Sequence, residues 1–171
     1  FLTEEKNKHL KKVATFASVG LSVGLTLMKM FAAFYTGSLA ILSSLIDSLA
    51  DIFASSITLI AVKYSSKPAS FGHRYGYGKA ESISALVQAA FIAGSGIFVL
   101  YDGICRLFEP KPMTEVGLGM VVMLISLVAT IFLISFQKYV AKKTNSIAIE
   151  ADSEHYSVDV ITNISIIITL A

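Results

Sequence analysis

Among the ionisable side chains inside the long apolar stretches of this 171-residue chain, four stand out because they form two matched pairs. Asp47 and Asp51 form the first pair, and His155 and Asp159 form the second. Each pair has i, i+4 spacing, which on a helix places both side chains on one face, one turn apart. A charged side chain at the centre of a membrane span costs about 2.5 to 3.5 kcal/mol, so each of these residues needs a reason to be there.

Brought together, the two pairs offer three carboxylates and one imidazole to a single cation. Such a set suits a tetrahedral site with ligand distances of about 2.0 to 2.2 Å. Magnesium prefers all-oxygen shells with retained water and Cu(I) prefers sulfur, so the imidazole favours Zn²⁺ and its neighbours Fe²⁺, Co²⁺ and Cd²⁺. The lone Cys105 excludes a thiolate cluster. The predicted metal ligands are Asp47, Asp51, His155 and Asp159.

Hydrogen bonding within a helix bundle is the alternative role for these side chains. For one pair alone the two interpretations would be about equal. Three charged carboxylates inside a membrane would together cost roughly 8 to 10 kcal/mol, which is more than one or two interhelical hydrogen bonds return. Two matched pairs therefore favour a metal site over packing.

The same arrangement predicts an exchange of metal for protons. Carboxylates crowded in a medium of low dielectric constant hold protons when no cation is present. A divalent cation needs deprotonated ligands, so its binding expels protons and reprotonation expels the metal. Histidine ordinarily titrates near neutral pH, which makes His155 the natural proton carrier. The pair Asp47 and Asp51 would be its coupled partner.

The composition points to a membrane protein. The chain is 54% hydrophobic and only 15% charged, with a mean hydropathy of +0.70, whereas soluble domains carry about a quarter charged residues. Its net charge of +2 and the lack of an arginine-rich run exclude nucleic acid as a partner. The partner surface is instead the lipid bilayer.

Five apolar runs are long enough to cross the membrane as helices, which takes about 20 residues each. Because the runs are continuous, they exclude a β-barrel of short alternating strands. We therefore predict an all-α, polytopic transmembrane helix bundle, with residues 1–12 as an N-terminal segment and residues 13–171 as the transmembrane domain. The predicted spans cover residues 13–35, 39–62, 83–107, 116–140 and 147–171.

Lysine and arginine placement predicts the orientation. These residues gather before the first span, between the second and third, and after the fourth, while only Arg106 and Lys111 lie on the other side. Flanking positive charge stays cytoplasmic, so the N-terminus is predicted to be cytoplasmic in a multi-pass protein of the inner (plasma) membrane. The run to Ala171 stops without a polar flank and the chain opens on Phe1, so we expect it to be part of a longer protein.

Three sequence stretches resemble the cation diffusion facilitator family, and more narrowly its bacterial zinc and ferrous-iron efflux branch. They are Thr36 to Leu42 running into Asp47 to Asp51, then Gly76 to Glu81, then His155 to Asp159. The likeness covers essentially the whole chain, with the motifs in the same order and separation. It implies a homodimer with six transmembrane helices per protomer and a cytoplasmic C-terminal domain, exporting divalent cations in exchange for protons. It assigns the same four residues to transport.

The resemblance also bears on the loop between the second and third spans. Related proteins hold a second metal there with an Asp and two His, whereas the matching positions here are Ser70, His73 and Tyr77. We expect His73 to be a solvated or capping histidine, with weak metal contact as the alternative. The family implies that Lys79 helps to hold the dimer. A sixth span and the C-terminal domain lie outside these residues.

Two polar residues near the predicted site have open roles. Lys29 could extend its ammonium to the membrane surface or meet a polar partner across the bundle. Asn163 lies one turn beyond Asp159 and could donate a hydrogen bond to it.

The function predicted from these residues is zinc efflux by proton antiport, with ferrous iron, cadmium or cobalt as other cargo. An enzyme is not expected, because there is no HExxH helix and four protein ligands would leave no open position on the metal. A membrane metal sensor or scaffold that does not transport is the alternative, since it would need the same ligands. The sequence does not rank zinc against ferrous iron or give the number of protons exchanged.

Overall fold

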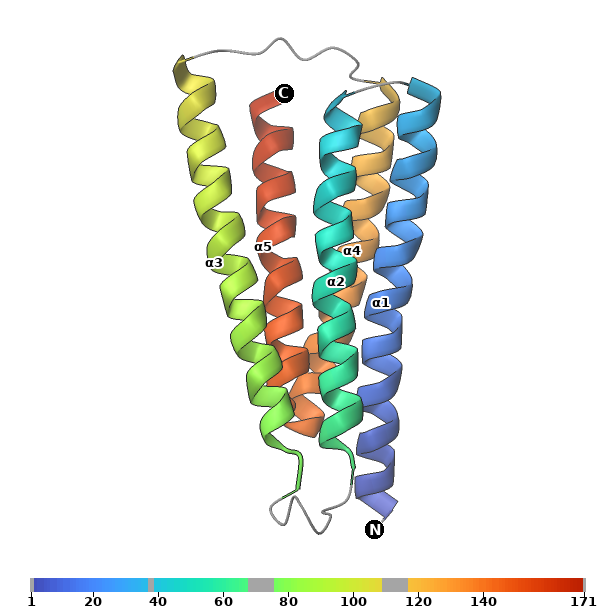
Figure 1. Ribbon diagram of the computed structural model, residues 1–171. Helices are drawn as coiled ribbons and strands as arrows, with labels where there is room; N and C mark the ends of the chain where they lie inside the picture. The colour runs from blue at the N-terminus through green and yellow to red at the C-terminus, as the bar shows by residue number, and fades with distance from the viewer. Residues whose placement is uncertain (1, 37–38, 68–75, 109–116, 171) are drawn as a thin grey trace.

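The computed structural model is a bundle of five α-helices (Figure 1). The helices are α1 (Leu2–Thr36), α2 (Leu39–Ser65), α3 (Lys79–Phe108), α4 (Gly117–Thr144) and α5 (Ile147–Leu170). The structure describes residues 2–36, 39–67, 76–108 and 117–170. Within these ranges there is no strand, so the predicted all-α fold is confirmed.

The helices run up and down, so the bundle has two distinct ends (Figure 1). We call the end that holds the first residues of α1, α3 and α5 the N-terminal end, and the other the opposite end. Helix α1 packs mainly on α2 and α4, and α5 packs mainly on α4 and α3. Helices α2 and α5 are thereby brought into contact.

The outer surface is apolar, as expected for lipid contact. Large exposed side chains occur on every helix, for example Phe34 on α1, Phe53 on α2 and Phe132 on α4. Among the described residues, three helices are long and apolar enough to cross a membrane, namely α1, α3 and α4. The acidic residues of the predicted site lie on the other two helices, α2 and α5. The bundle is therefore a membrane protein with its polar groups turned inward.

A compact apolar core lies at the N-terminal end. Small and β-branched side chains from α1, α2, α4 and α5 pack there with no more than 7% exposure. Small residues allow helix backbones to approach closely, which is how membrane helices gain packing energy. The cluster consists of Ala14, Val62, Val140, Ala141, Ala148 and Ile149.

A tight turn between α4 and α5 closes this end. Asn145 adopts a positive φ of 50°, a left-handed conformation that asparagine tolerates better than most residues. The N–H of Ser146 donates to the carbonyl of Ala141, at 3.3 Å, and the Ser146 carbonyl accepts from the N–H of Glu150, at 3.1 Å. The turn therefore fixes where α5 begins, and so the height of every side chain along it.

A buried carboxylate ties four segments together at the same end. Glu81 on α3 accepts hydrogen bonds from Lys11 at 2.7 Å, from Ser65 at 2.8 Å and from Ser146 at 2.6 Å. These partners come from α1, α2 and the α4–α5 turn. We call these four residues the Glu81 cluster. Lys79, for which the family implies a role in the dimer, is exposed nearby on the first turn of α3.

Candidate metal site

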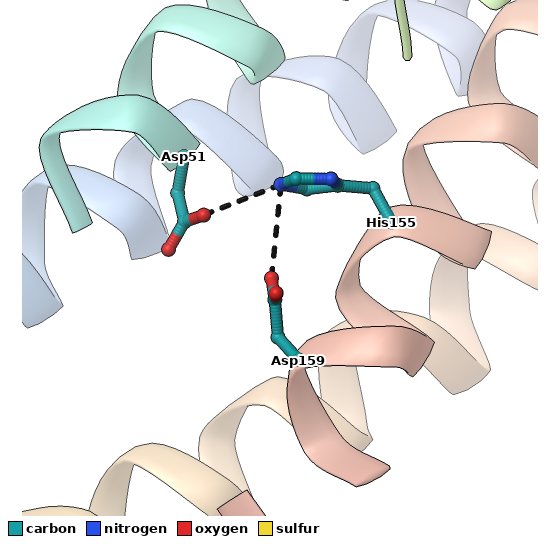
Figure 2. Close-up of side chains that lie close together, drawn as sticks. All are labelled: Asp51, His155 and Asp159. Atoms are coloured by element: carbon teal, nitrogen blue, oxygen red, sulfur yellow. Dashed lines mark hydrogen bonds and ion pairs between the residues drawn. The ribbon is translucent and has the colours of Figure 1, made fainter. Parts of the chain in front are cut away.

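Three of the four predicted ligands converge between α2 and α5. Asp51, His155 and Asp159 each offer one ligand atom, and these atoms lie within 4.8 Å of one another. The Nε2 atom of His155 is 3.3 Å from Oδ1 of Asp51 and 3.7 Å from Oδ2 of Asp159. Figure 2 shows the imidazole ring facing Asp51 across the gap between the helices, with Asp159 one turn further along α5.

Packing holds the histidine ring in place. Its side chain is only 5% exposed, and its ring lies edge-on to that of Phe91 on α3, with centroids 6.5 Å apart. The ring of Tyr156 meets it edge-on from the same helix at 5.8 Å. The carboxylates of Asp51 and Asp159 are 23% and 31% exposed. The imidazole is therefore fixed, while the two acids have room to adjust.

Asp159 differs from its neighbours in its hydrogen bonding. Its Oδ2 atom is buried and has no hydrogen-bond partner within the described part of the chain. Asn163, for which a hydrogen bond to Asp159 was one expectation, lines the same cavity, but no such bond reaches this oxygen. Buried polar atoms are normally hydrogen-bonded, so an unpaired carboxylate oxygen aimed at two other ligands needs a further explanation.

Asp47 stands apart from this group. It lies one turn before Asp51 on α2, is exposed, and does not belong to the set of three converging ligand atoms. It is nevertheless an electrostatic neighbour of Asp51 and of Lys29. Its part in the metal site stays a prediction.

Lys29 meets a polar partner across the bundle. Its ammonium donates to the Ser48 hydroxyl on α2 at 2.7 Å, which decides between the two roles open from sequence. The nearby carboxylates of Asp51, Asp47 and Asp159 attract the same ammonium. A positive charge therefore already lies beside the acidic residues.

A small cavity of about 40 Å³ is lined by two of the three converging residues, Asp51 and Asp159. One water molecule needs roughly 10 to 15 Å³ on this measure, so the cavity is large enough for a solvated ion to approach. Its polar lining includes Lys29, Ser48, Asp51, Thr130, Asp159 and Asn163. A larger, apolar groove of about 280 Å³ between α4 and α5, lined by Ile131 and Ile161, faces outward and carries none of the ligands.

The cavity lies on one side of the ligands. On α5 it is lined by Asp159 and Asn163, which follow His155 toward the opposite end of the bundle. On α1 and α2 it is lined by Lys29 and Ser48, at the same end. The side toward the N-terminal end is occupied by packed side chains.

Those side chains centre on Asp152, a residue that sequence reasoning did not single out. Asp152 is fully buried on α5, one turn nearer the N-terminal end than His155. Its Oδ2 accepts from Gln137 at 2.6 Å and from Ser18 at 2.7 Å. Its Oδ1 accepts from Gln88 at 3.0 Å and from Ser55 at 3.4 Å. We call these five residues the Asp152 hub.

Tyr156 lies between the hub and the cavity. Its hydroxyl bonds to that of Ser55 at 2.6 Å, and its oxygen lies 3.4 Å from the hydroxyl oxygen of Ser18. It also makes a short contact with the hydroxyl of Ser22. The Tyr156 hydroxyl thereby joins the serines of α1 and α2 in a layer of polar groups between the candidate site and the N-terminal end.

A sequence signal for the hub did exist. Asp152 is three residues before His155 and seven before Asp159, and Gln88 and Gln137 are amides in the interior of apolar spans. His73, which we expect to be a solvated or capping histidine with weak metal contact as the alternative, lies outside the described residues, as does Ser70.

The structure is thus a membrane helix bundle in which three side chains that could hold a metal ion converge between two helices. Residues 15–171 match the family model described as "Cation efflux transmembrane domain", and the chain belongs to this family. The resemblance drawn from the sequence motifs is confirmed.

Two relatives carry the name "Cation-efflux pump FieF". The protein of Escherichia coli (strain K12 / DH10B) is 46% identical over 157 residues, which cover 92% of this chain and 52% of the relative. The protein of Escherichia fergusonii is 46% identical over 158 residues, which cover 92% of this chain and 53% of the relative. The chain spans about half the length of the curated relatives that it matches.

Proposed function

We propose that this chain is the transmembrane part of a divalent cation efflux transporter. Zinc is the favoured cargo, with ferrous iron, cadmium and cobalt as neighbours in ligand preference. The observation that carries the proposal is the convergence of Asp51, His155 and Asp159 beside a cavity inside the bundle. The relatives' name, cation-efflux pump, supports it.

The hydrogen bonding of the acids favours a cation over a packing role. A carboxylate that serves only to hold helices together would fill its lone pairs with donors, as Asp152 does. The buried oxygen of Asp159 has none. An ion at the centre of the three ligands would supply the missing partner, and it would offset the cost of charged groups inside the membrane.

Asp47 completes the proposed site as the fourth ligand. Its exposed side chain can rotate toward Asp51 once a cation neutralises the repulsion between the two carboxylates. The set of three carboxylates and one imidazole then matches a closed tetrahedral site. With no cargo bound, the ammonium of Lys29 supplies part of the neutralising charge.

Proton exchange follows from the chemistry of these ligands. A bound divalent cation requires deprotonated carboxylates and a neutral imidazole, so the protons held at Asp51, Asp159 and His155 leave as it binds. When protons return to these atoms the cation is released. The transporter would therefore work as an antiporter, with a proton gradient driving export.

The position of the cavity fits one half of an alternating-access cycle. If the N-terminus is cytoplasmic, as the lysine distribution predicts, the Asp152 hub and the Glu81 cluster lie on the cytoplasmic side of the site. The cavity then lies on the outer side, where cargo is released. For a cation to enter from the cytoplasm, the contacts of the Asp152 hub and of the Glu81 cluster would have to separate while the site moves as a unit.

Several finer features belong to the same proposal. We place the protein in the inner (plasma) membrane, as a homodimer to which Lys79 contributes, with protons and divalent cations as its small partners. Two roles compete with this function. A membrane sensor or scaffold would bind the metal without moving it, and an enzyme would need an open position on the metal.

Zinc uptake into inside-out vesicles carrying the full-length protein tests the function. We expect uptake that depends on an imposed proton gradient and is lost in Asp51→Ala. Glu154→Ala is the matched control, because Glu154 is an exposed acid beside His155 that pairs with Lys138 at 3.0 Å. It should transport like the wild type. Zinc binding without flux in the wild type would show a sensor or scaffold instead.

A further inference from the structure

The Asp152 hub connects every helix in the bundle to one carboxylate. Its four donors are Ser18 on α1, Ser55 on α2, Gln88 on α3 and Gln137 on α4, and the acceptor is on α5. A carboxylate has about four lone-pair positions. All four are therefore filled by neutral donors, one from each of the other helices.

The hub and the metal ligands share one face of α5. At 3.6 residues per turn, Asp159 lies about 20° around the helix from Asp152, and His155 about 60° around it. The rise of about 1.5 Å per residue puts His155 about 4.5 Å along the axis from Asp152. Any rotation of α5 that breaks the hub must also turn both ligands away from Asp51.

The hub also fixes the helix that carries the third ligand. Ser55 lies one turn after Asp51 on α2, and it donates to Asp152 on α5. The two helices that form the metal site are thus joined again one turn nearer the N-terminal end. The contacts to α1, α3 and α4 restrict the tilting of α5 in the remaining directions.

From these contacts we propose that Asp152 is a positioning residue for the metal site, one that sets the rotation and height of α5 so that His155 and Asp159 meet Asp51. This inference rests on the proposed function in so far as the three ligands bind a metal. Asp152 itself does not touch the cargo. It acts only through the helix that it holds.

The orientation of the two glutamines suggests a variant of Asp152 that removes the negative charge of its side chain but keeps the shape. Gln137 and Gln88 both donate to Asp152 through their amide nitrogens, and the Gln88 nitrogen also donates to the Ala54 carbonyl. The buried carbonyl oxygens of both glutamines have no hydrogen-bond partner among the described residues. In Asp152→Asn, an amide of nearly equal shape replaces the carboxylate. Gln137 can flip its amide and accept from the new N–H group, which keeps the helix in place without the charge, whereas Gln88 is held in its orientation by the Ala54 carbonyl and the Thr58 hydroxyl.

Cobalt binding to the purified full-length protein tests the inference, because the visible spectrum of Co²⁺ reports tetrahedral geometry directly. Asp152→Ala should weaken Co²⁺ binding by about 10- to 100-fold and reduce the tetrahedral bands, as loss of a group that orients a ligand does. Asp152→Asn should keep both near wild type. Ser153→Ala is the matched control, since Ser153 is equally buried but bonds only to the Glu150 carbonyl of its own helix.

Each outcome bears on the proposal. A folded Asp152→Ala with the wild-type spectrum and affinity overturns it, and so does an Asp152→Asn that fails as badly as the alanine variant, because charge rather than position would then act. If Asp152→Ala does not fold, Gln137→Met removes the shortest donor alone and should still shift the spectrum. Its unchanged spectrum would count against the proposal.

The function and the positioning role can fail separately. Wild-type protein that binds Co²⁺ through Asp51 but moves no zinc would contradict transport and leave the spectral test of Asp152 intact. Wild-type transport together with an undisturbed Asp152→Ala spectrum would contradict the positioning role alone.

Discussion

Two carboxylates on α5, those of Asp152 and Asp159, differ in the hydrogen bonds that the surrounding helices donate to them. Asp152 is fully buried and accepts four hydrogen bonds, one from each of the other helices. Asp159 lies two turns further along on the same face, and its buried oxygen accepts none. Both are aspartates on one face of the same helix, so residue type does not distinguish them. Their neighbours do.

The difference separates Asp152, whose carboxylate stabilises the structure by hydrogen bonding, from Asp159, which has a carboxylate oxygen without a hydrogen-bond donor among the described residues. Donors packed around a carboxylate lower the free energy of the folded protein but leave no lone pair for a cation. An acid kept without donors costs stability and keeps its affinity for metal. Glu81 is an intermediate case, since it has three donors and one of them is the charged Lys11.

The largest effect should come from the unpaired acid. Asp159→Asn removes a ligand charge, and we expect zinc transport to fall to background in vesicles. The free energy of unfolding should stay level or rise, because a costly intramembrane charge is removed. Transport and unfolding measured on the same preparation check both parts. If Asp159→Asn were as unstable as Asp152→Ala, Asp159 would have a structural role like that of Asp152.

Stability should respond most to the paired acid. Asp152→Ala removes the acceptor that four buried donors share, at about 1 to 3 kcal/mol for each donor that is left without a partner. Gln137 is the donor most affected, because Gln88, Ser18 and Ser55 each have a further partner. Denaturant unfolding in detergent micelles should show the loss, and Asp152→Asn should recover most of it. An alanine variant with unchanged stability would mean that the donors find other partners easily.

The Glu81 cluster should show a smaller effect of the same kind. We expect a double-mutant cycle of Lys11→Met and Glu81→Gln to give a coupling energy of about 1.5 to 3 kcal/mol, the range for hydrogen bonds to charged groups. Both side chains are largely buried, at 17% and 11% exposure, so solvent screens the pair only in part. The exposed pair of Lys138 and Glu154 is the comparison and should couple by less than about 1 kcal/mol.

The smallest predicted effect concerns the charge beside the site. Lys29→Met removes an ammonium that competes with the cargo for the same carboxylates, so Co²⁺ affinity should rise by roughly three- to tenfold. Titration of the purified protein measures this directly. Lys12→Met, at an exposed position near the start of α1, should leave the affinity unchanged. A weaker site in Lys29→Met would show that the lysine orders the ligands instead.

Much of the fold could be predicted because it depends on local pattern. Apolar runs of about 20 residues specify helices in a membrane whatever their neighbours are. Asp51, His155 and Asp159 were found for the same reason, since charges within such runs stand out.

The hub escaped prediction because its meaning is tertiary. Asp152 lies between Glu150 and Glu154 near the start of its helix, where an acid looks ordinary. Its spacing to His155 and Asp159 places it on the face of the predicted ligands, but what distinguishes it is the set of donors on four other helices, which local spacing does not indicate. The exposure of Asp47 is likewise set by the packing around α2, which helix periodicity alone does not give.

The hub also bears on the order in which the chain can assemble. Its acceptor lies on α5, the last helix of this chain to be made, whereas its four donors lie on the four helices made before it. Until α5 inserts, those hydroxyls and amides have no carboxylate to bind within an apolar medium, and the first four helices cannot settle into their final packing. Arrival of one aspartate gives all four donors a common acceptor, so the packing of the first four helices around this layer should be completed only once α5 is in place.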